Sequence, residues 1–257
     1  MKQAGLTIQA LSRGLGLLES VAARGGEGAL TDLCKDAGLH RSTAHHLLQT
    51  LVVHGYVTQD DASRAYRLGP KVYRLASATW SEAQIAQLAL PYLRELVRLT
   101  GETANLAIRK DDQAILLETV DGEGTLRVVD RIGAARPIHA CAVGKVLLAF
   151  SPAEEHASIM KGLTLKAQTP RTIVERDKLS RELVKIRSSG YALDDEEMAL
   201  GVRCIAAPVF AMPGQVVAAV GVAGPATRVT RRTLLKIEKP LSAAVRRLSS
   251  RLSRIGE

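Results

Sequence analysis

The stretch from 41 to 54 combines an apolar stripe with a polar face of distinctive chemistry. Its apolar residues follow the i, i+3, i+4, i+7, i+8 spacing of a helix that buries one side: Ala44, Leu47, Leu48, Leu51 and Val52. The opposite side offers a cation and hydrogen-bonding groups: Arg41, Ser42, His45, His46 and Gln49. It contains no carboxylate, which phosphate would repel. Such a face is typical of a surface that binds nucleic acid.

Short elements on both sides position this helix. An apolar stripe over 30–37 predicts a helix with Thr31 as its N-cap, and Gly38 can end that helix in a left-handed conformation. After Gly55, strands are predicted over 56–58 and 66–68, with a polar turn over 59–64. This order predicts a winged helix-turn-helix, whose second helix enters the DNA major groove. The alternative is a small helical subdomain that packs on a partner.

The residues predicted to contact DNA lie on the first helix, the recognition helix and the hairpin: Arg13, Arg41, Ser42, Thr43, His45, His46, Gln49, Arg64, Arg67 and Lys71. The recognition helix is assigned to bases and phosphates, and the hairpin to the phosphate backbone. A two-fold dimer would read a pseudo-palindrome in double-stranded operator DNA.

Composition narrows the class of protein. A chain of 257 residues suits two domains, and a net charge of +9 fits a polyanionic partner. Aromatic residues, at 3%, are too few for binding that depends on base stacking. Cys34, Cys141 and Cys204 are too widely spaced for a disulfide framework or a CxxC metal site. No signal peptide or membrane span is visible, so a cytoplasmic protein is expected.

The rest of the chain predicts an α+β fold. A first helix is expected over 8–22, a connector helix over 72–80, and a helix over 83–99 in which Pro91 implies a kink or two abutting helices. Strands are predicted over 104–108, 114–120, 126–129, 204–210 and 216–222. Helices are predicted over 137–150, 152–160, 177–189 and 231–255. The expected organisation is a DNA-binding domain over 1–71, a linker helix over 72–82 and an α+β domain with an antiparallel sheet over 83–257.

Three segments resemble the isocitrate lyase regulator (IclR) family of transcriptional regulators, and together they extend over nearly the whole chain. The first is the winged helix over 30–68, which ends in Tyr66-Arg67-Leu68-Gly69. The second is Pro137-Ile138-His139-Ala140-Cys141-Ala142-Val143-Gly144-Lys145. The third places Gly190, Asp194, Glu197 and Cys204 at spacings of 4, 3 and 7. Ala211 departs from the pattern, because the family usually has Asp or Asn there.

The resemblance implies a one-component regulator without a cofactor, active as a dimer or tetramer. Its second domain would be a GAF-like sensor whose effector lies between the sheet and the loop before Gly144. The implied positions, with Arg127 added as a nearby partner for a carboxylate, are Thr125, Arg127, Val128, Ala142, Val143, Asp194, Cys204, Gly221 and Ala223. Gly221 and Ala223 stand where relatives often have hydroxyls, which favours a bulkier effector, such as an aromatic carboxylate.

Plainer interpretations stay open beside these. Arg127, Arg131 and Arg136 stand near this pocket in the sequence, and any one of them could pair with a carboxylate, but each can also be a surface residue. Asp194 can be a cap or turn residue. Cys204 is interpreted as a wall of the pocket rather than a nucleophile, and Lys145 as structural. The segment 142–145 lacks the remaining residues of a phosphate-binding loop, and His139 with Cys141 lacks further zinc ligands.

The function predicted is a ligand-responsive repressor of a catabolic operon, with the connector helix as lever and dimer contact. One alternative is an activator of the same family. The others are an enzyme that acts on a small carboxylate and an architectural DNA-binding protein without an effector.

Overall fold

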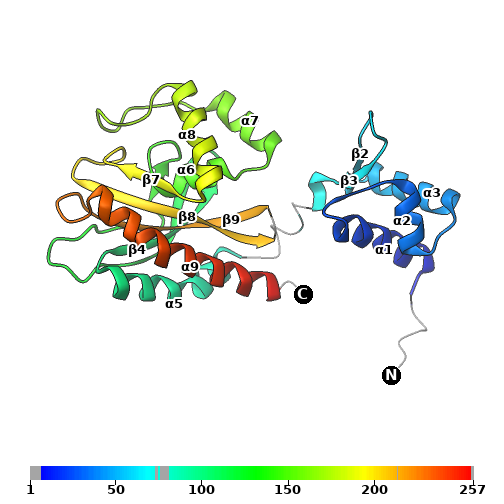
Figure 1. Cartoon of the computed structure of the whole chain (residues 1–257), viewed down its shortest axis with the longest axis horizontal. Helices are drawn as coiled ribbons and strands as arrows, with labels where there is room; N and C mark the ends of the chain where they lie inside the picture. Colours follow the sequence, from blue (N-terminus) through cyan, green and yellow to red (C-terminus); the bar gives the residue numbers. More distant parts are fainter. Residues whose placement is uncertain (1–6, 73–74, 76–80, 213, 256–257) are drawn as a thin grey trace. The chain divides into compact units, whose positions relative to one another are not determined.

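A computed structural model describes residues 7–72, 75, 81–212 and 214–255. The chain divides into two compact units, Met1–Thr79 and Trp80–Glu257 (Figure 1). Most of the connector helix predicted over 72–80, with its role as a lever and dimer contact, lies outside the described residues. No helix of the described part of the chain is both long and apolar enough to cross a bilayer.

The first unit is a three-helix domain with a small antiparallel sheet. Its helices are α1 (Gln9–Ala23), α2 (Leu30–Ala37) and α3 (Arg41–Val53). Its strands are β1 (Glu27–Gly28), β2 (Val57–Gln59) and β3 (Tyr66–Leu68), in the order β1-β3-β2. Leu17, Leu33, Leu48 and Tyr66 are fully buried between these elements. The winged helix-turn-helix is therefore confirmed.

Local turns of this unit agree with the sequence in part. Gly38 ends α2 with φ 61°, and Gly55 follows α3 with φ 75°, both in the left-handed region that glycine tolerates. The N-cap prediction for Thr31 is wrong, because α2 begins after Ala29 and no side chain caps it. Strand β1 was not predicted, since two residues are too short to show an alternating pattern.

The second unit is built on one antiparallel sheet in the order β6-β5-β4-β9-β8-β7. The strands are β4 (Thr103–Lys110), β5 (Gln113–Val120), β6 (Ala135–Pro137), β7 (Ala192–Asp195), β8 (Val202–Met212) and β9 (Gln215–Pro225). Helices α5 (Glu82–Thr100) and α9 (Arg231–Ile255) cover one face. The helices associated with the other face are α6 (Ala142–Ala149), α7 (Ala153–Gly162) and α8 (Arg176–Ser189) (Figure 1). The predicted α+β class is confirmed.

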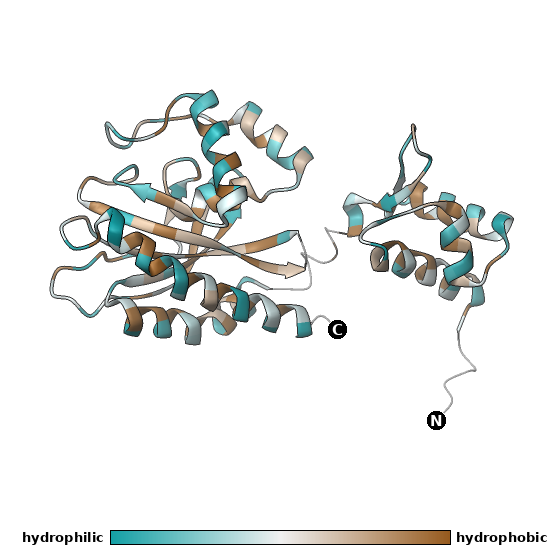
Figure 2. Ribbon diagram, in the orientation of Figure 1, coloured by the Kyte–Doolittle hydropathy of each residue, from teal (hydrophilic) through white to brown (hydrophobic). Residues whose placement is uncertain are grey.

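Alternation along the strands separates two apolar layers. On β9, Val220 and Val222 point to α5 and α9, while Ala219 and Ala223 point to the α6 face. Apolar colour follows β8 and β9 and returns at intervals along α5 and α9, as in a helix with one buried side (Figure 2). The α6 face is rich in small residues, so α6 packs close to the sheet and is buried along its whole length.

Close packing also explains Gly144 within α6. A Cβ at this position would lie 2.7 Å from the Cα of Ile138, closer than side chains come to a backbone. The chain before the helix therefore crosses directly over Gly144. The Gly144-Lys145 pair is a packing feature, consistent with rejecting a phosphate-binding loop.

Several predicted elements of this unit need correction. Residues 126–129 form no strand, because Leu126 and Val129 are exposed and the edge position belongs to β6. The helix predicted from 137 begins at Ala142, after Pro137 has paired in β6. Helix α5 runs through Pro91 as one element, so two abutting helices are excluded. Strand β7 was missed, since its sequence was interpreted as an acidic turn.

Candidate nucleic-acid interface and ligand site

Helix α3 presents the polar face predicted from its sequence. Ala44 and Leu48 are buried in the core of the first unit, which turns the opposite side to solvent. Arg41, Ser42 and His46 are exposed, and Thr43, His45 and Gln49 are partly exposed. This face can donate and accept hydrogen bonds without placing a negative charge beside a phosphate.

The N-terminus of α3 adds backbone donors to this face. His40 is the N-cap, and its side chain makes no capping hydrogen bond. The first N–H groups of the helix therefore lack an intrahelical partner, and the positive end of the helix dipole favours an anion there. Within the described residues, the guanidinium of Arg41 has no hydrogen-bond or ion-pair partner. The Arg41 guanidinium and the unpaired backbone N–H groups therefore lie together at the start of α3.

The other cations of the first unit fall into two groups. Arg13 on α1 and Arg64 in the hairpin turn are exposed, and neither side chain has a partner within the described part of the chain. Arg67 is instead paired with Glu27 at 3.0 Å and Asp60 at 3.3 Å, an arrangement that joins β1, β3 and the turn. Lys71 lies over the Tyr56 ring at 5.0 Å. Arg64 is thus better placed than Arg67 to contact a phosphate.

In the second unit, strand register brings several predicted effector residues onto one sheet face. Cys204 is the register partner of Ala223 on β9 and of Asp194 on β7, so the three side chains share the α6 face. Ala142 and Val143, at the start of α6, pack against the same cluster. All five residues are buried, and we call the surface that they form between the sheet and α6 the ligand face.

The loop over 121–134, between β5 and β6, packs against this face. Val128 joins the apolar cluster, and its carbonyl oxygen accepts a hydrogen bond from the Thr103 hydroxyl at 2.6 Å. Thr125 and Arg127 are exposed, and Arg127 pairs with Asp121 at 3.4 Å. Val128 therefore packs against this face of the sheet, whereas the side chains of Thr125 and Arg127 are exposed to solvent.

Gly221 does not enlarge the site as its sequence suggested. A Cβ on Gly221 would lie 2.6 Å from Asn105 Oδ1, 2.9 Å from Val143 Cγ1 and 3.3 Å from Cys204 Sγ. These neighbours already fill the space that the missing side chain leaves. The expectation of a hollow at Gly221 is wrong for this arrangement, because Val143 and Asn105 close over the glycine.

On this face, the buried residues Asn105 and Asp130 and the partly buried Arg136 form a polar cluster that sequence reasoning largely missed. The Asp130 side chain is fully buried, and its carboxylate accepts hydrogen bonds from Arg136 and, at 2.7 Å, from Asn105 Nδ2. Asn105 Oδ1 is buried without a hydrogen-bond partner among the described residues. Asn105 was detectable as the polar residue of an apolar strand, whereas no pattern marks Asp130. Of the three arginines considered for a carboxylate, Arg136 is the one that reaches this cluster.

Asp194 is both a turn residue and part of the site face. Its Oδ1 accepts hydrogen bonds from the backbone N–H groups of Glu197 at 2.7 Å and Met198 at 3.3 Å. Burial raises the pKa of Asp194 to about 7, although these N–H groups act in the opposite direction. A carboxyl with this pKa is partly neutral near neutral pH.

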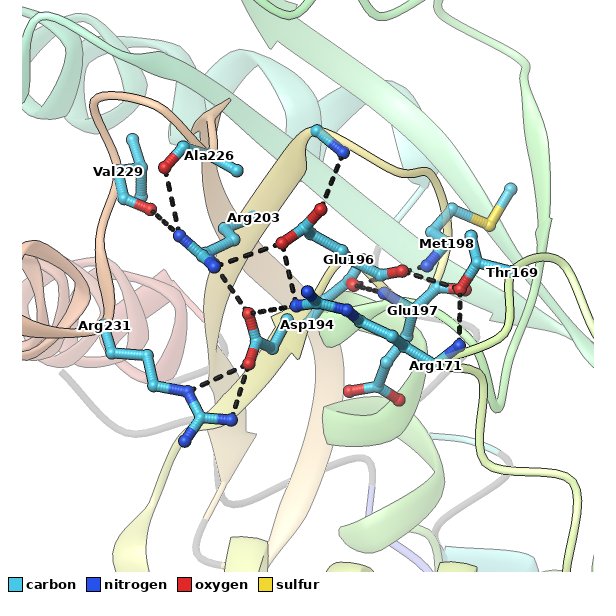
Figure 3. A network of polar contacts seen from close by, with 12 residues as sticks. Thr169, Arg171, Asp194, Glu196, Glu197, Met198, Arg203, Ala226, Val229 and Arg231 are labelled. Atoms are coloured by element: carbon cyan, nitrogen blue, oxygen red, sulfur yellow. Dashed lines mark hydrogen bonds and ion pairs between the residues drawn. The ribbon is translucent and has the colours of Figure 1, made fainter.

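A buried ion pair ties α6 to the turn after β7. Lys145 Nζ is 2.5 Å from Glu197 Oε1, and the lysine side chain is fully buried. Burial raises the pKa of Glu197, and Lys145 opposes that shift. Around the same turn, the Arg203 guanidinium donates to Glu196 at 3.1 Å and to the carbonyl oxygens of Ala226 and Val229 (Figure 3). Lys145 is therefore part of a structural network.

The open groove beside β7 does not offer unused cations. Arg171 and Arg231 line it, and both pair with carboxylates of the network. Arg171 pairs with Glu196 at 2.8 Å (Figure 3), and Arg231 pairs with Asp195 at 2.6 Å. The groove is thus not a ready site for an anion.

The thiols of the ligand face are poorly suited to nucleophilic chemistry. Burial raises the pKa of Cys141 to about 11 and that of Cys204 well above its usual range. Both thiols therefore stay protonated, which fits the interpretation of Cys204 as a pocket wall. Within the described residues, no group of His, Cys, Asp and Glu side chains is arranged to hold a metal ion.

Comparison with known proteins matches both units. A family described as "IclR helix-turn-helix domain" matches residues 10–61, and one described as "Bacterial transcriptional regulator IclR C-terminal" matches residues 77–250. The HTH-type transcriptional regulator XynR of Escherichia coli is 36% identical over 95% of this chain and 97% of its own length. The Escherichia coli transcriptional repressor IclR is 36% identical over 87% of this chain and 82% of its own. The crystal structure of the Thermotoga maritima IclR matches with a TM-score of 0.64 and 27% identity, covering 96% of this chain and all of that one.

Proposed function

The chain belongs to the IclR family of DNA-binding transcriptional regulators, and from that membership we propose that it is a repressor relieved or strengthened by a small carboxylate. The observation that carries the proposal is the separation of two sites. One unit presents a carboxylate-free helix with an open N-terminus. The other unit encloses a polar cluster beneath a loop.

For the DNA site, Arg41 and the first turn of α3 contact bases and phosphates, and Arg64 contacts the backbone from the hairpin. Arg13 and Lys71 add phosphate contacts, while Arg67 chiefly holds the hairpin together. The interaction would follow the usual division, in which phosphate contacts position the protein and base contacts specify the sequence. Two copies would read a pseudo-palindrome.

A homo-oligomer is part of this proposal. Leu11 and Leu15 on α1, together with the N-cap residue Ile8, are half or more exposed and recur at helical spacing. A stripe of this kind on a soluble domain favours contact with another apolar surface, and a second copy is the simplest occupant.

For the effector, the support is the cationic and backbone donor groups of the ligand face. Arg136 supplies a guanidinium, and no side chain caps α6, so the N–H groups of Ala142 and Val143 face the site end of that helix. An aromatic carboxylate requires Val143 and Asn105 to move, because they fill the space beside Gly221. Aliphatic and aromatic acids therefore both belong in a binding screen.

The test begins with selection of genomic fragments that the full-length protein binds, followed by titration of the best fragment with a panel of carboxylates. We expect a specific fragment, a panel member that changes its affinity, and higher expression of the adjacent gene when the regulator is deleted. Lower expression on deletion would make the protein an activator. Specific DNA binding that no panel member changes would favour an architectural role.

Site assignment is tested separately with Arg41→Ala. It should weaken fragment binding while leaving effector binding unchanged. The control is Arg251→Ala, which removes an exposed arginine from α9 in the other unit and should leave fragment binding as it is. Equal loss in both variants would contradict the assignment of the DNA site to α3.

A further inference from the structure

Asp130 carries a negative charge into the interior of the ligand face. Its neighbours in the loop, Val129 and Arg131, are exposed, whereas the Asp130 side chain is completely buried. A carboxylate is costly to bury unless it is paired and hydrogen-bonded. The position of Asp130 therefore depends on the partners that it finds beneath the loop.

Those partners are the groups that a free carboxylate would use. The Arg136 guanidinium donates to Asp130 Oδ1, and the Asn105 amide donates to Oδ2 at 2.7 Å. A guanidinium and an amide that bind opposite oxygens form a compact receptor for one carboxylate. The Arg136 side chain is one-fifth exposed, so this residue of the receptor is in contact with solvent.

The receptor belongs to the same space as the remaining effector residues. Asn105 Oδ1 and Cys204 Sγ lie 2.6 and 3.3 Å from one point, the Cβ position of Gly221. Asn105 Oδ1 is also an acceptor without a partner among the described residues. Because the neighbours of Gly221 fill this space, a ligand would satisfy Asn105 Oδ1 only if it carried a donor group besides its carboxylate and Val143 moved aside.

Asp130 also anchors the loop over 121–134. The other side-chain contacts to its middle are neutral acceptors on the loop: the Val128 carbonyl binds Thr103, and the Leu126 carbonyl binds Arg228 at 3.0 Å. Among the described residues, Asp130 is the one carboxylate of this loop that accepts hydrogen bonds from side chains of the sheet strands. Removing it should loosen the loop selectively.

We propose that Asp130 is an internal occupant of an anion subsite formed by Arg136 and Asn105, and that a carboxylate effector binds by displacing it. Two carboxylates cannot share this small buried receptor without leaving one charge unpaired. Displacement would free residues 121–134, and this release is the conformational change that effector binding produces. The inference rests on the proposed function for its effector, but the internal occupancy can be tested without one.

The first experiment measures hydrogen exchange of peptides from 121–134 in the full-length protein, for wild type, Asp130→Ala and Asp121→Ala. Asp121 is the matched control, because it is an exposed carboxylate of the same loop. We expect exchange at least about tenfold faster in Asp130→Ala alone, which is the effect of losing one charged hydrogen-bond set. Unchanged exchange in that variant would overturn the proposal.

The second experiment uses acetate as the probe, with chloride at equal ionic strength as its control. Acetate should occupy the vacated subsite of Asp130→Ala, return loop exchange toward the wild-type rate and raise the midpoint of thermal unfolding. It should do neither in wild type nor in the double variant Asp130→Ala/Arg136→Ala. An equal acetate effect in all variants, or none in any, would argue against a carboxylate receptor at this position.

Two further measurements keep the outcome clear. If Asp130→Ala does not fold, Asp130→Asn replaces it, since this variant keeps the shape and removes the charge, and faster loop exchange is again expected.

Operator affinity then separates the claim that Asp130 occupies the subsite from the claim that release of the loop is the signal. A loosened loop without a change in operator affinity retains the internal occupant and rejects release of the loop as the signal. A wild-type operator response to a carboxylate, with loop exchange unchanged in the Asp130 variants, supports the proposed function and rejects the internal occupant.

Discussion

Asp194 offers a quantitative test of the electrostatics of the ligand face. The residue is 2% exposed, and its carboxyl group has a pKa of about 7, against an ordinary value of 3.8. Because the folded state favours the neutral form, it binds more protons than the unfolded chain between about pH 4 and pH 7. The contribution of Asp194 to the free energy of unfolding is therefore most favourable at low pH and is lost as the pH rises through that window.

The perturbation is Asp194→Asn, which removes the titration and keeps an oxygen for the N–H of Glu197. The folded and unfolded pKa values of Asp194 differ by about three units. Ionisation of this buried carboxyl therefore lowers the free energy of unfolding of the wild type by about 4 kcal/mol between low pH and pH 8, and about 2 kcal/mol of that loss falls between pH 5.5 and pH 8. We therefore expect the free energy of unfolding of the variant, relative to wild type, to rise by about 2 kcal/mol over that interval. The measurement is urea unfolding at both pH values, followed by circular dichroism.

Asp195→Asn is the matched control, because it removes the adjacent carboxyl group, whose pKa is shifted in the opposite direction. Hydrogen bonding to Arg203, with help from Arg231, lowers the pKa of Asp195. Its native pairing therefore stabilises the fold above the unfolded pKa, and that contribution is lost as the pH falls through the folded pKa. A pH-independent difference between Asp194→Asn and wild type would refute the assignment of a near-neutral pKa to Asp194.

Three further predictions concern packing, charge and DNA. Gly144→Ala should lower the free energy of unfolding by more than about 2 kcal/mol, because the added Cβ would meet the backbone of the preceding loop. Gly162→Ala is the control, since its Cβ would enter open space and should change stability little. Thermal unfolding compares the two variants. Lys145→Met should destabilise the protein by roughly 3–5 kcal/mol by leaving Glu197 buried and unpaired, and adding Glu197→Gln should recover part of the loss in the same assay. Arg41→Ala should reduce the slope of log affinity against log salt by about 0.9 if it loses one phosphate contact; an unchanged slope with weaker binding would assign Arg41 to bases.

The first unit was predictable because its signals are local. Gly38 and Gly55 mark the ends of two amphipathic helices within a few residues, and both adopt the left-handed conformation that such ends require. Pairing of β2 with β3 follows from a short polar turn between two apolar segments. The error at Thr31 is also local, since a hydroxyl near a helix start marks the region without fixing which residue is the cap.

The second unit was predictable in class but not in detail, because its details depend on distant contacts. Leu126, Arg127 and Val128 alternate in polarity as in a strand, yet β6 takes the edge position beside β5 and the segment becomes a loop. The contact of Asn105 with Asp130 joins residues 25 positions apart and leaves no periodic pattern. Gly221 suggested a hollow because its sequence cannot show that Val143 and Asn105 occupy the space.

The balance of charge on the ligand face limits how an anion can enter it. Arg136 is paired with Asp130, and Lys145 is paired with Glu197, so each of these cations already has a carboxylate. A carboxylate effector must therefore displace one of those two carboxylates, or bind while a neighbouring carboxyl group of the protein is protonated and neutral. Asp194, which is neutral in part near pH 7, lowers the repulsion that a third carboxylate would otherwise exert. Displacement of Asp130 is the less costly route, because Asp130 lies on a loop that can carry its charge back to water, whereas Glu197 is held in a turn by the Thr169 and Thr172 hydroxyls.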